Sequence, residues 1–116
     1  MDASSAVTAL SALAHEHRLA AYRMLVEAGP DGLAAGVIAE RLGLPPSSLT
    51  FHLQALLQAG LATQRRVSRQ IIYAMVPAAM NGLVAYLTEH CCGGQGGCGP
   101  ACEPVAPSAP EGASAA

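Results

Sequence analysis

All four cysteines of the chain stand in one short stretch: Cys91, Cys92, Cys98 and Cys102. Cys91 and Cys92 are adjacent, and a spacer of five residues, GGQGG, separates them from Cys98. Glycine makes such a spacer flexible, so Cys98 can fold back to the adjacent pair. Thiolates are soft ligands that select soft ions, and paired thiols also undergo redox exchange. The spacing therefore favours a soft-ion site or a thiol switch.

The rest of the sequence predicts that these thiols are reduced. The N-terminal residues MDASSAVTAL lack the basic and apolar regions of a secretory signal. Although 52% of the residues are hydrophobic, no run approaches the roughly 18 apolar residues of a membrane span. We therefore expect a cytoplasmic protein without a membrane partner. In that compartment, clustered cysteines are metal ligands or redox groups before they are disulfides.

Composition divides the chain into a folding part and a tail. From Gly93 onward the sequence is mostly Gly, Ala, Pro, Ser and Cys, a composition that buries too little apolar area to offset the entropy of ordering. We expect one small domain over residues 1–92 and a flexible tail over residues 93–116. A domain of that size has a modest core, so a second subunit that covers apolar surface would help it.

Hydrophobic spacing and chain breakers predict the elements that position the cysteines. Ser47 or Ser48 is expected to cap the helix that follows Pro45 and Pro46, and Gly60 ends that helix. The expected order is three helices, a short turn, a fourth helix, a β-hairpin and a last helix. This order indicates a mainly α fold with a β-hairpin wing, a winged helix-turn-helix. The expected helices span 4–14, 15–28, 33–42, 47–59 and 78–92, and the expected strands span 61–67 and 69–76.

The fourth helix has two different faces at 100° per residue. Its leucines fall on one side, and polar but uncharged side chains fall on the other. Hydroxyls and amides on an outward face suit base-edge contacts in a DNA major groove, and the ring of Phe51 could meet a thymine methyl. An ordinary solvated helix face is the alternative interpretation. The candidate DNA contacts on this helix are Ser47, Ser48, Thr50, Phe51 and Gln54.

Charge is unevenly distributed along a chain whose formal net charge is −2. Four arginines and no acidic residue lie between Arg41 and Thr88. Three of them, Arg65, Arg66 and Arg69, fall near the turn of the expected hairpin. We expect these guanidinium groups to contact phosphates or a minor groove, supplying affinity while the fourth helix supplies sequence preference.

These residues resemble a known family. The stretch SSLTFHLQALLQAGLATQRRVSRQIIYAMV is similar to the winged helix-turn-helix repressors of the ArsR/SmtB family, and HEHRLAAYRMLVEAG and VIAERLGLP resemble the family's second and third helices. The resemblance covers about residues 4 to 92. It implies a homodimer built from the first and last helices. It also implies binding to two-fold symmetric double-stranded operator DNA, with release when a metal or metalloid binds. The matching residues are Ser47, Ser48, His52, Leu53, Leu56, Ala59, Gly60, Leu61, Arg65, Arg69 and Tyr73.

Three departures from the family pattern bear on what this chain would sense. Ser68 stands at the wing tip, where the family normally has glycine. The third helix, LAAGVIAERLG, has no Cys-x-Cys pair of the arsenic, cadmium or lead sensors. The last helix offers only Glu89 and His90 for the family's zinc site. Neither usual inducer site is therefore present.

The sequence LTEHCC, with a further cysteine five residues later, resembles the C-terminal arsenite site of one branch of the family. Trivalent arsenic takes three thiolates, so we expect As(III) or Sb(III) to bind Cys91, Cys92 and Cys98, with Cys102 as a spare or alternative ligand. Other soft ions, structural zinc, a redox switch through Cys91 and Cys92, and an inert tail remain alternatives.

The four histidines suggest little chemistry by themselves. We expect His52 to be packed and hydrogen-bonded at the edge of the leucine stripe, and His15 and His17 to lie at a helix start. His90 is expected at a solvated helix end. No pairing of a nucleophile with a base, phosphate-cradling loop or carboxylate dyad stands out, so the sequence predicts a protein that is not an enzyme.

Overall fold

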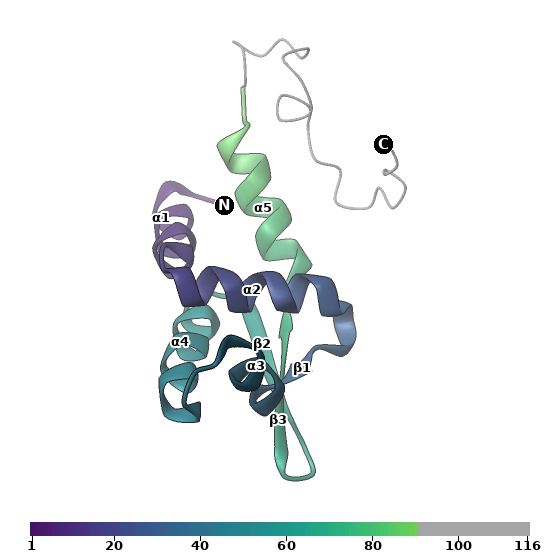
Figure 1. Cartoon of the computed structure of the whole chain (residues 1–116). Helices are drawn as coiled ribbons and strands as arrows, with labels where there is room; N and C mark the ends of the chain where they lie inside the picture. The colour runs from purple at the N-terminus through teal and green to yellow at the C-terminus, as the bar shows by residue number, and fades with distance from the viewer. Residues whose placement is uncertain (91–116) are drawn as a thin grey trace.

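The computed structural model describes residues 1–90, and their arrangement is that of a winged helix-turn-helix (Figure 1). The prediction of a mainly α fold with a β-hairpin is confirmed. Along the chain the elements are α1 (Ala3–Leu13), α2 (Glu16–Ala28), the 3-10 turn η1 (Gly29–Asp31), β1 (Leu33–Ala34), α3 (Ala35–Leu42), α4 (Pro46–Gln58), β2 (Ala62–Val67), β3 (Gln70–Met75) and α5 (Pro77–Leu87).

The hairpin belongs to a three-stranded antiparallel sheet with the order β1-β3-β2. The expected third helix was wrong at its start, because Leu33 and Ala34 form β1 and α3 begins only at Ala35. A two-residue strand is too short to show a period of its own. Its position depends on Gly32, which has a φ of 74° and lies so close to the Tyr73 carbonyl that a side chain would clash there. This close approach brings the residue before β1 next to β3, the strand with which β1 pairs.

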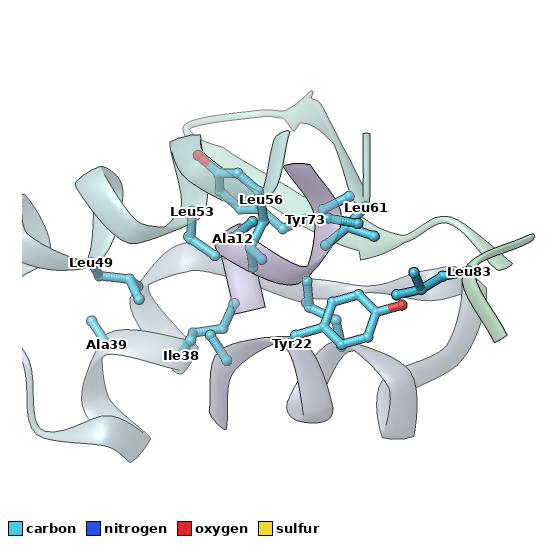
Figure 2. Close-up of a cluster of buried hydrophobic side chains, with 14 of the residues drawn as sticks. Ala12, Tyr22, Ile38, Ala39, Leu49, Leu53, Leu56, Leu61, Tyr73 and Leu83 are labelled. Atoms are coloured by element: carbon cyan, nitrogen blue, oxygen red, sulfur yellow. The ribbon is translucent and has the colours of Figure 1, made fainter. Parts of the chain in front are cut away.

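The centre of the core is formed by α2, α3, α4 and the residue that leads into β2, and α1, β2, β3 and α5 add smaller or single buried side chains to it. Its largest fully buried side chains are aliphatic, and burying each contributes about 1.5–3 kcal/mol. Figure 2 shows Leu49, Leu53 and Leu56 of α4 in one cluster with Ile38 of α3. The core therefore holds α4 by one face and leaves the other free. The fully buried side chains of this set are Leu25, Ile38, Leu49, Leu53, Leu56 and Leu61.

Helix α1 packs through small side chains. Its buried residues are Ala6, Ala9 and Ala12, whereas Val7 and Leu10 are 61% and 42% exposed. Alanines let the helix approach its neighbours closely, but they leave the larger apolar side chains facing solvent. Figure 1 shows α1 beside α5 at the end of the molecule that lies away from the hairpin tip.

Two helix ends differ from the predictions. Pro45 caps α4 and Pro46 is its first residue, so neither Ser47 nor Ser48 is the N-cap. Proline suits this position because the first turn of a helix leaves its N–H groups unpaired and needs the φ that proline already has. Helix α5 ends at Leu87 and stops short of the predicted Cys92. Just beyond it, the Thr88 hydroxyl donates to the Val84 carbonyl at 2.8 Å, and His90 has a φ of 58°.

The predicted thiol site lies outside the described residues. This applies to Cys91, Cys92, Cys98 and Cys102, and to the tail predicted over residues 93–116. Within residues 1–90, no helix is long and apolar enough to cross a membrane.

Candidate nucleic-acid interface

Helix α4 has the two faces that its sequence predicts. Leu49, Leu53 and Leu56 are buried, which turns the opposite face of the helix to solvent. Phe51 is 66% exposed, the largest exposed fraction among the large hydrophobic side chains of the described residues. The assignment of this face to DNA contact stays a prediction. All five of its predicted contact residues are exposed: Ser47, Ser48, Thr50, Phe51 and Gln54.

The outward face of α4 carries no charged side chain, so its hydrogen-bonding groups are hydroxyls and amides. The Thr50 hydroxyl already donates to the Pro46 carbonyl at 3.0 Å. This bond uses its single proton and leaves the oxygen as an acceptor for an external donor. Gln54 carries both a donor and an acceptor, which is the pattern that can pair with an adenine edge.

The hairpin carries the three predicted arginines, and all of them are exposed. Arg65 and Arg66 are neighbours on β2 and therefore point to opposite faces of the sheet. Arg65 Nη2 donates to the Asp31 carbonyl at 2.9 Å. Sequence reasoning missed this bond, since it joins residues 34 positions apart. Arg65 thus ties the hairpin to the turn before β1 and still has further N–H groups for a phosphate.

The turn of the hairpin shows how the chain accommodates Ser68 at the wing tip. Val67 pairs with Gln70, so Ser68 and Arg69 form a two-residue connection. Ser68 has a φ of 59°, in the left-handed region that glycine adopts without cost. The turn therefore has the tight geometry that a glycine would allow, and the backbone of Ser68 is strained because its φ is positive.

A cluster of basic side chains, which sequence reasoning did not assemble, lies where the start of α2 meets α4. The ring centroids of His15 and His52 are 4.5 Å apart, and that of His17 is 5.5 Å from the first and 5.6 Å from the second. Arg18 Nε donates to Nδ1 of His52 at 3.3 Å. The predicted packed, hydrogen-bonded state of His52 is confirmed. His15 is the N-cap of α2.

The electrostatics of this cluster follow from its composition. Burial lowers the pKa of His52, and the basic groups of His15, Arg18 and His17 lower it further. Two separate features of the sequence belong to this cluster: the segment HEHR at residues 15–18, and His52 at the edge of the leucine stripe. Neither feature indicates that the two segments are in contact. Within residues 1–90, no group of three His, Cys, Asp or Glu side chains is arranged to hold a metal ion.

Comparisons with known proteins relate this chain to transcriptional regulators. A family model described as a helix-turn-helix domain matches residues 13–65. The HTH-type transcriptional regulator YgaV of Escherichia coli (strain K12) is 31% identical over 91 residues, which are 78% of this chain and 90% of YgaV.

Two solved structures have the same architecture. Reduced HlyU from Vibrio cholerae N16961 superposes with a TM-score of 0.61 at 29% identity, over 77% of this chain and 90% of that one. An ArsR-like transcriptional regulator from Rhodococcus sp. RHA1 superposes with a TM-score of 0.60 at 28% identity, over 72% of this chain and 76% of that one. Each likeness covers more than two thirds of this chain, a larger part than the helix-turn-helix match over residues 13–65.

Proposed function

The chain belongs to the ArsR/SmtB family of winged helix-turn-helix transcriptional regulators, and we propose that it is a repressor that binds double-stranded operator DNA through α4 and the β2–β3 hairpin. The observation that carries this proposal is the pairing of two surfaces. The exposed face of α4 offers hydroxyls and amides without charge, and the adjacent hairpin offers three arginines. Such a division suits base readout by the helix and phosphate contact by the hairpin.

A homodimer is the form in which this repressor would bind. Val7 and Leu10 of α1 and Leu87 of α5 are exposed, as is Met1 next to α1. An apolar surface shared by two adjacent helices indicates contact with another protein surface. A second copy fits because a two-fold axis lets the same face serve both partners. The dimer would present two α4 helices, and its operator would be two-fold symmetric.

The inducer in this proposal is As(III) or Sb(III), held by Cys91, Cys92 and Cys98, with Cys102 as an alternative third ligand. Its support is chemical: three soft thiolates occur within eight residues of one another. They follow α5, which carries part of the apolar surface assigned to the dimer. Ligand capture there would change the relation between the two subunits and thus the spacing of their α4 helices.

The coupling between the two sites sets the size of the response. A typical allosteric coupling of about 1–3 kcal/mol would weaken DNA binding roughly 5- to 150-fold. Because coupling is reciprocal, operator DNA would weaken arsenite binding by the same factor. An arsenite affinity that is equal with and without DNA would contradict this mechanism.

A thiol redox switch is the second candidate. The adjacent Cys91 and Cys92 could respond to oxidants, and the similar protein HlyU has been solved in a form called reduced. In this version the DNA-binding surface is the same, and only the signal differs. Release of DNA by mild peroxide, without any response to arsenite, would favour it.

The first experiment identifies the DNA. The full-length reduced protein is used to select tight-binding duplexes from a randomised pool, and the affinity of the enriched sequence (the selected duplex) is measured by fluorescence anisotropy. We expect a selected duplex with two-fold symmetry and an affinity at least 1000-fold above that of a scrambled duplex, a typical ratio for specific binding. Failure to enrich any sequence would overturn the proposed function.

The second experiment concerns the thiols. Cys91→Ser or Cys92→Ser should leave the affinity for the selected duplex unchanged and abolish its release by arsenite. Cys102→Ser is the matched control, since it removes a thiol from the same segment and should keep the response. Alkylation and mass spectrometry of the reduced wild type with arsenite should show one arsenic per chain and protection of Cys91, Cys92 and Cys98. Unprotected thiols would exclude the arsenite site.

A further inference from the structure

The basic cluster between α2 and α4 has no part in the function proposed above. This histidine cluster consists of His15, His17, Arg18 and His52. His15 is exposed, whereas the other three side chains are half-buried. Four basic groups from two helices therefore share one small region that solvent, or a ligand, can reach.

The hydrogen bonds within the cluster define its protonation. Nδ1 of His52 accepts from Arg18 Nε, and Nδ1 of His15 accepts from the His17 backbone N–H at 3.1 Å. An imidazole that accepts at Nδ1 is neutral and carries its proton on Nε2. Both rings thus retain an Nε2–H donor, and the Arg18 guanidinium retains N–H groups that His52 does not use. The cluster combines one fixed positive charge with several donors, which suits an oxyanion.

No acidic side chain forms a salt bridge with the histidine cluster among the described residues 1–90. Helix α1 packs against both α2 and α4, and its residues Ala3–Leu13 include no ionisable side chain. Glu16 stands between the two histidines of α2 but is exposed, and α3 contributes Glu40 and Arg41 near its end. None of these acids is among the groups that shift the pKa of His52, since after burial the causes are His15, Arg18 and His17. The ring of His52 in the free protein therefore resists protonation.

The cluster lies beside the exposed face of α4. The Arg18 guanidinium carbon is 5.8 Å from the ring centroid of Phe51, and that ring is 5.8 Å from the ring of His52. Phe51 belongs to the outward face assigned to the major groove. Figure 1 shows the start of α2 next to α4, on the side of the molecule where α1 also lies. A helix in a major groove is flanked by the phosphates of the groove edge, so a basic group beside it can meet a phosphate.

We propose that the histidine cluster binds one backbone phosphate of the DNA and takes up a proton as it does so. The proton comes from solvent hydronium and forms an N–H bond at Nδ1 of His15 or His52, which then gives up the hydrogen bond that it accepts from the His17 N–H or from Arg18 Nε. This inference rests on the proposed DNA binding, and it adds a phosphate contact and a pH dependence that the arginines of the hairpin do not provide. Arg18 acts in it as the permanent charge, and the histidines act as the adjustable ones.

The sign of the pH dependence follows from linkage. A bound phosphate stabilises the imidazolium form, so the pKa of the cluster is higher in the complex than in the free protein. The contribution to affinity is fully present below the free-state pKa and is lost as the pH rises through the pKa of the complex. Because burial and the neighbouring basic groups hold the pKa of free His52 below the ordinary histidine value of about 6.5, the loss falls in a window that opens below pH 6.5 and closes at the raised pKa of the complex. Uptake of one proton changes affinity by at most about tenfold per pH unit, so we expect a three- to tenfold weakening across this range.

The test uses the full-length reduced protein and the selected duplex, with a chelator present and at constant ionic strength. The dissociation constant is measured from pH 5.8 to pH 7.8. The double variant His15→Asn and His52→Gln should bind with little pH dependence, at about the affinity of the wild type at high pH. Asn can still cap α2, and the Gln oxygen can still accept from Arg18. His90→Gln is the matched control, because this histidine lies outside the cluster and should keep the wild-type pH profile.

The outcomes separate this inference from the proposed function. Tight but pH-independent binding by the wild type would overturn the phosphate contact and leave DNA binding intact, as would an unchanged pH profile in the double variant. If no duplex is selected, both proposals fail. Circular dichroism checks that the double variant folds. If it does not, His17→Gln replaces it and should lose part of the pH dependence.

Discussion

Two exposed regions of this molecule differ in chemistry. The polar end consists of the outward face of α4 and the β2–β3 hairpin, where hydroxyls, amides and guanidinium ions accompany three exposed apolar side chains, Phe51, Val67 and Ile71. The apolar end consists of the exposed side chains of α1 and α5, among them Val7, Leu10 and Leu87. Water solvates the polar and charged groups of the first surface well, so these groups need no partner to be stable. Water solvates the second poorly, so it indicates a protein partner.

The separation of the two regions has a functional consequence. Figure 1 places α1 and α5 away from the tip of the hairpin. A dimer formed through the apolar end therefore leaves both hairpins and both α4 helices free for DNA. If the two regions have these separate roles, a substitution in either one should affect only one step of assembly directly. The following three experiments test that separation.

The largest effect is expected at the apolar end. Leu10→Glu places a charge on a side chain that is 42% exposed in the single chain and would be buried in the dimer. We expect a monomer by analytical ultracentrifugation. Its affinity for the selected duplex should fall by about 100-fold or more, because a single subunit loses the gain from binding two half-sites at once. Circular dichroism should show an unchanged fold.

Val26→Glu is the matched control for this substitution. Val26 is 46% exposed, but it lies on α2 and outside the apolar end. We expect this variant to remain a dimer with wild-type DNA affinity. A Leu10→Glu protein that stays dimeric would contradict the assignment of α1 to the interface.

An intermediate effect is expected at the polar end. Arg65→Ala removes one charge that we predict to contact phosphate, together with the hydrogen bond to the Asp31 carbonyl. We expect about fivefold weaker binding to the selected duplex, since a hydrogen bond contributes about 1 kcal/mol. The slope of log affinity against log salt should fall by about 0.9, the value for one phosphate contact. The protein should remain a dimer.

Arg23→Ala provides the comparison with Arg65→Ala. Arg23 is exposed on α2 and pairs with Glu27 at 3.8 Å. Its loss removes the same charge from the chain but no predicted DNA contact, so affinity and salt slope should not change. Equal losses in the two variants would mean that net charge alone, and no particular contact, governs binding.

The smallest effect is expected at the hairpin tip. Ser68→Gly relieves the left-handed backbone of Ser68, which costs about 1 kcal/mol for a residue with a side chain. Part of this gain is lost because glycine is more flexible in the unfolded chain. The free energy of unfolding should therefore rise by less than about 1 kcal/mol in a urea titration, with DNA affinity unchanged. A destabilised variant would mean that the serine side chain has a role of its own in the turn.

The sequence predicted α4 well because helix geometry is local. Leucines at positions 49, 53 and 56 return to the same side of a helix, and Leu49, Leu53 and Leu56 are all buried. The two strands of the hairpin were also predictable, since alternating and β-branched residues flank a short turn. Ends were harder. Two serines after Pro46 looked like caps, but the prolines themselves begin the helix.

Contacts between distant segments could not be predicted in the same way. Strand β1 is only two residues long and exists because it pairs with β3, about 40 positions later. The bond from Arg65 to Asp31 and the bond from Arg18 to His52 each span 34 positions. The periodicity of one segment gives no information about which distant segment it contacts.

The sequence by itself determined the family, the division of α4 into two faces and the grouping of the thiols, because each depends on residue types at short and regular spacing. Only the tertiary structure decided that His15, His17 and Arg18 lie against His52 and that Arg65 is tied to the base of the hairpin. The physical reason is the way the helices pack. The buried leucines of α4 and the buried face of α2 fill one core, and that packing brings together polar side chains which nothing in their own segments selects.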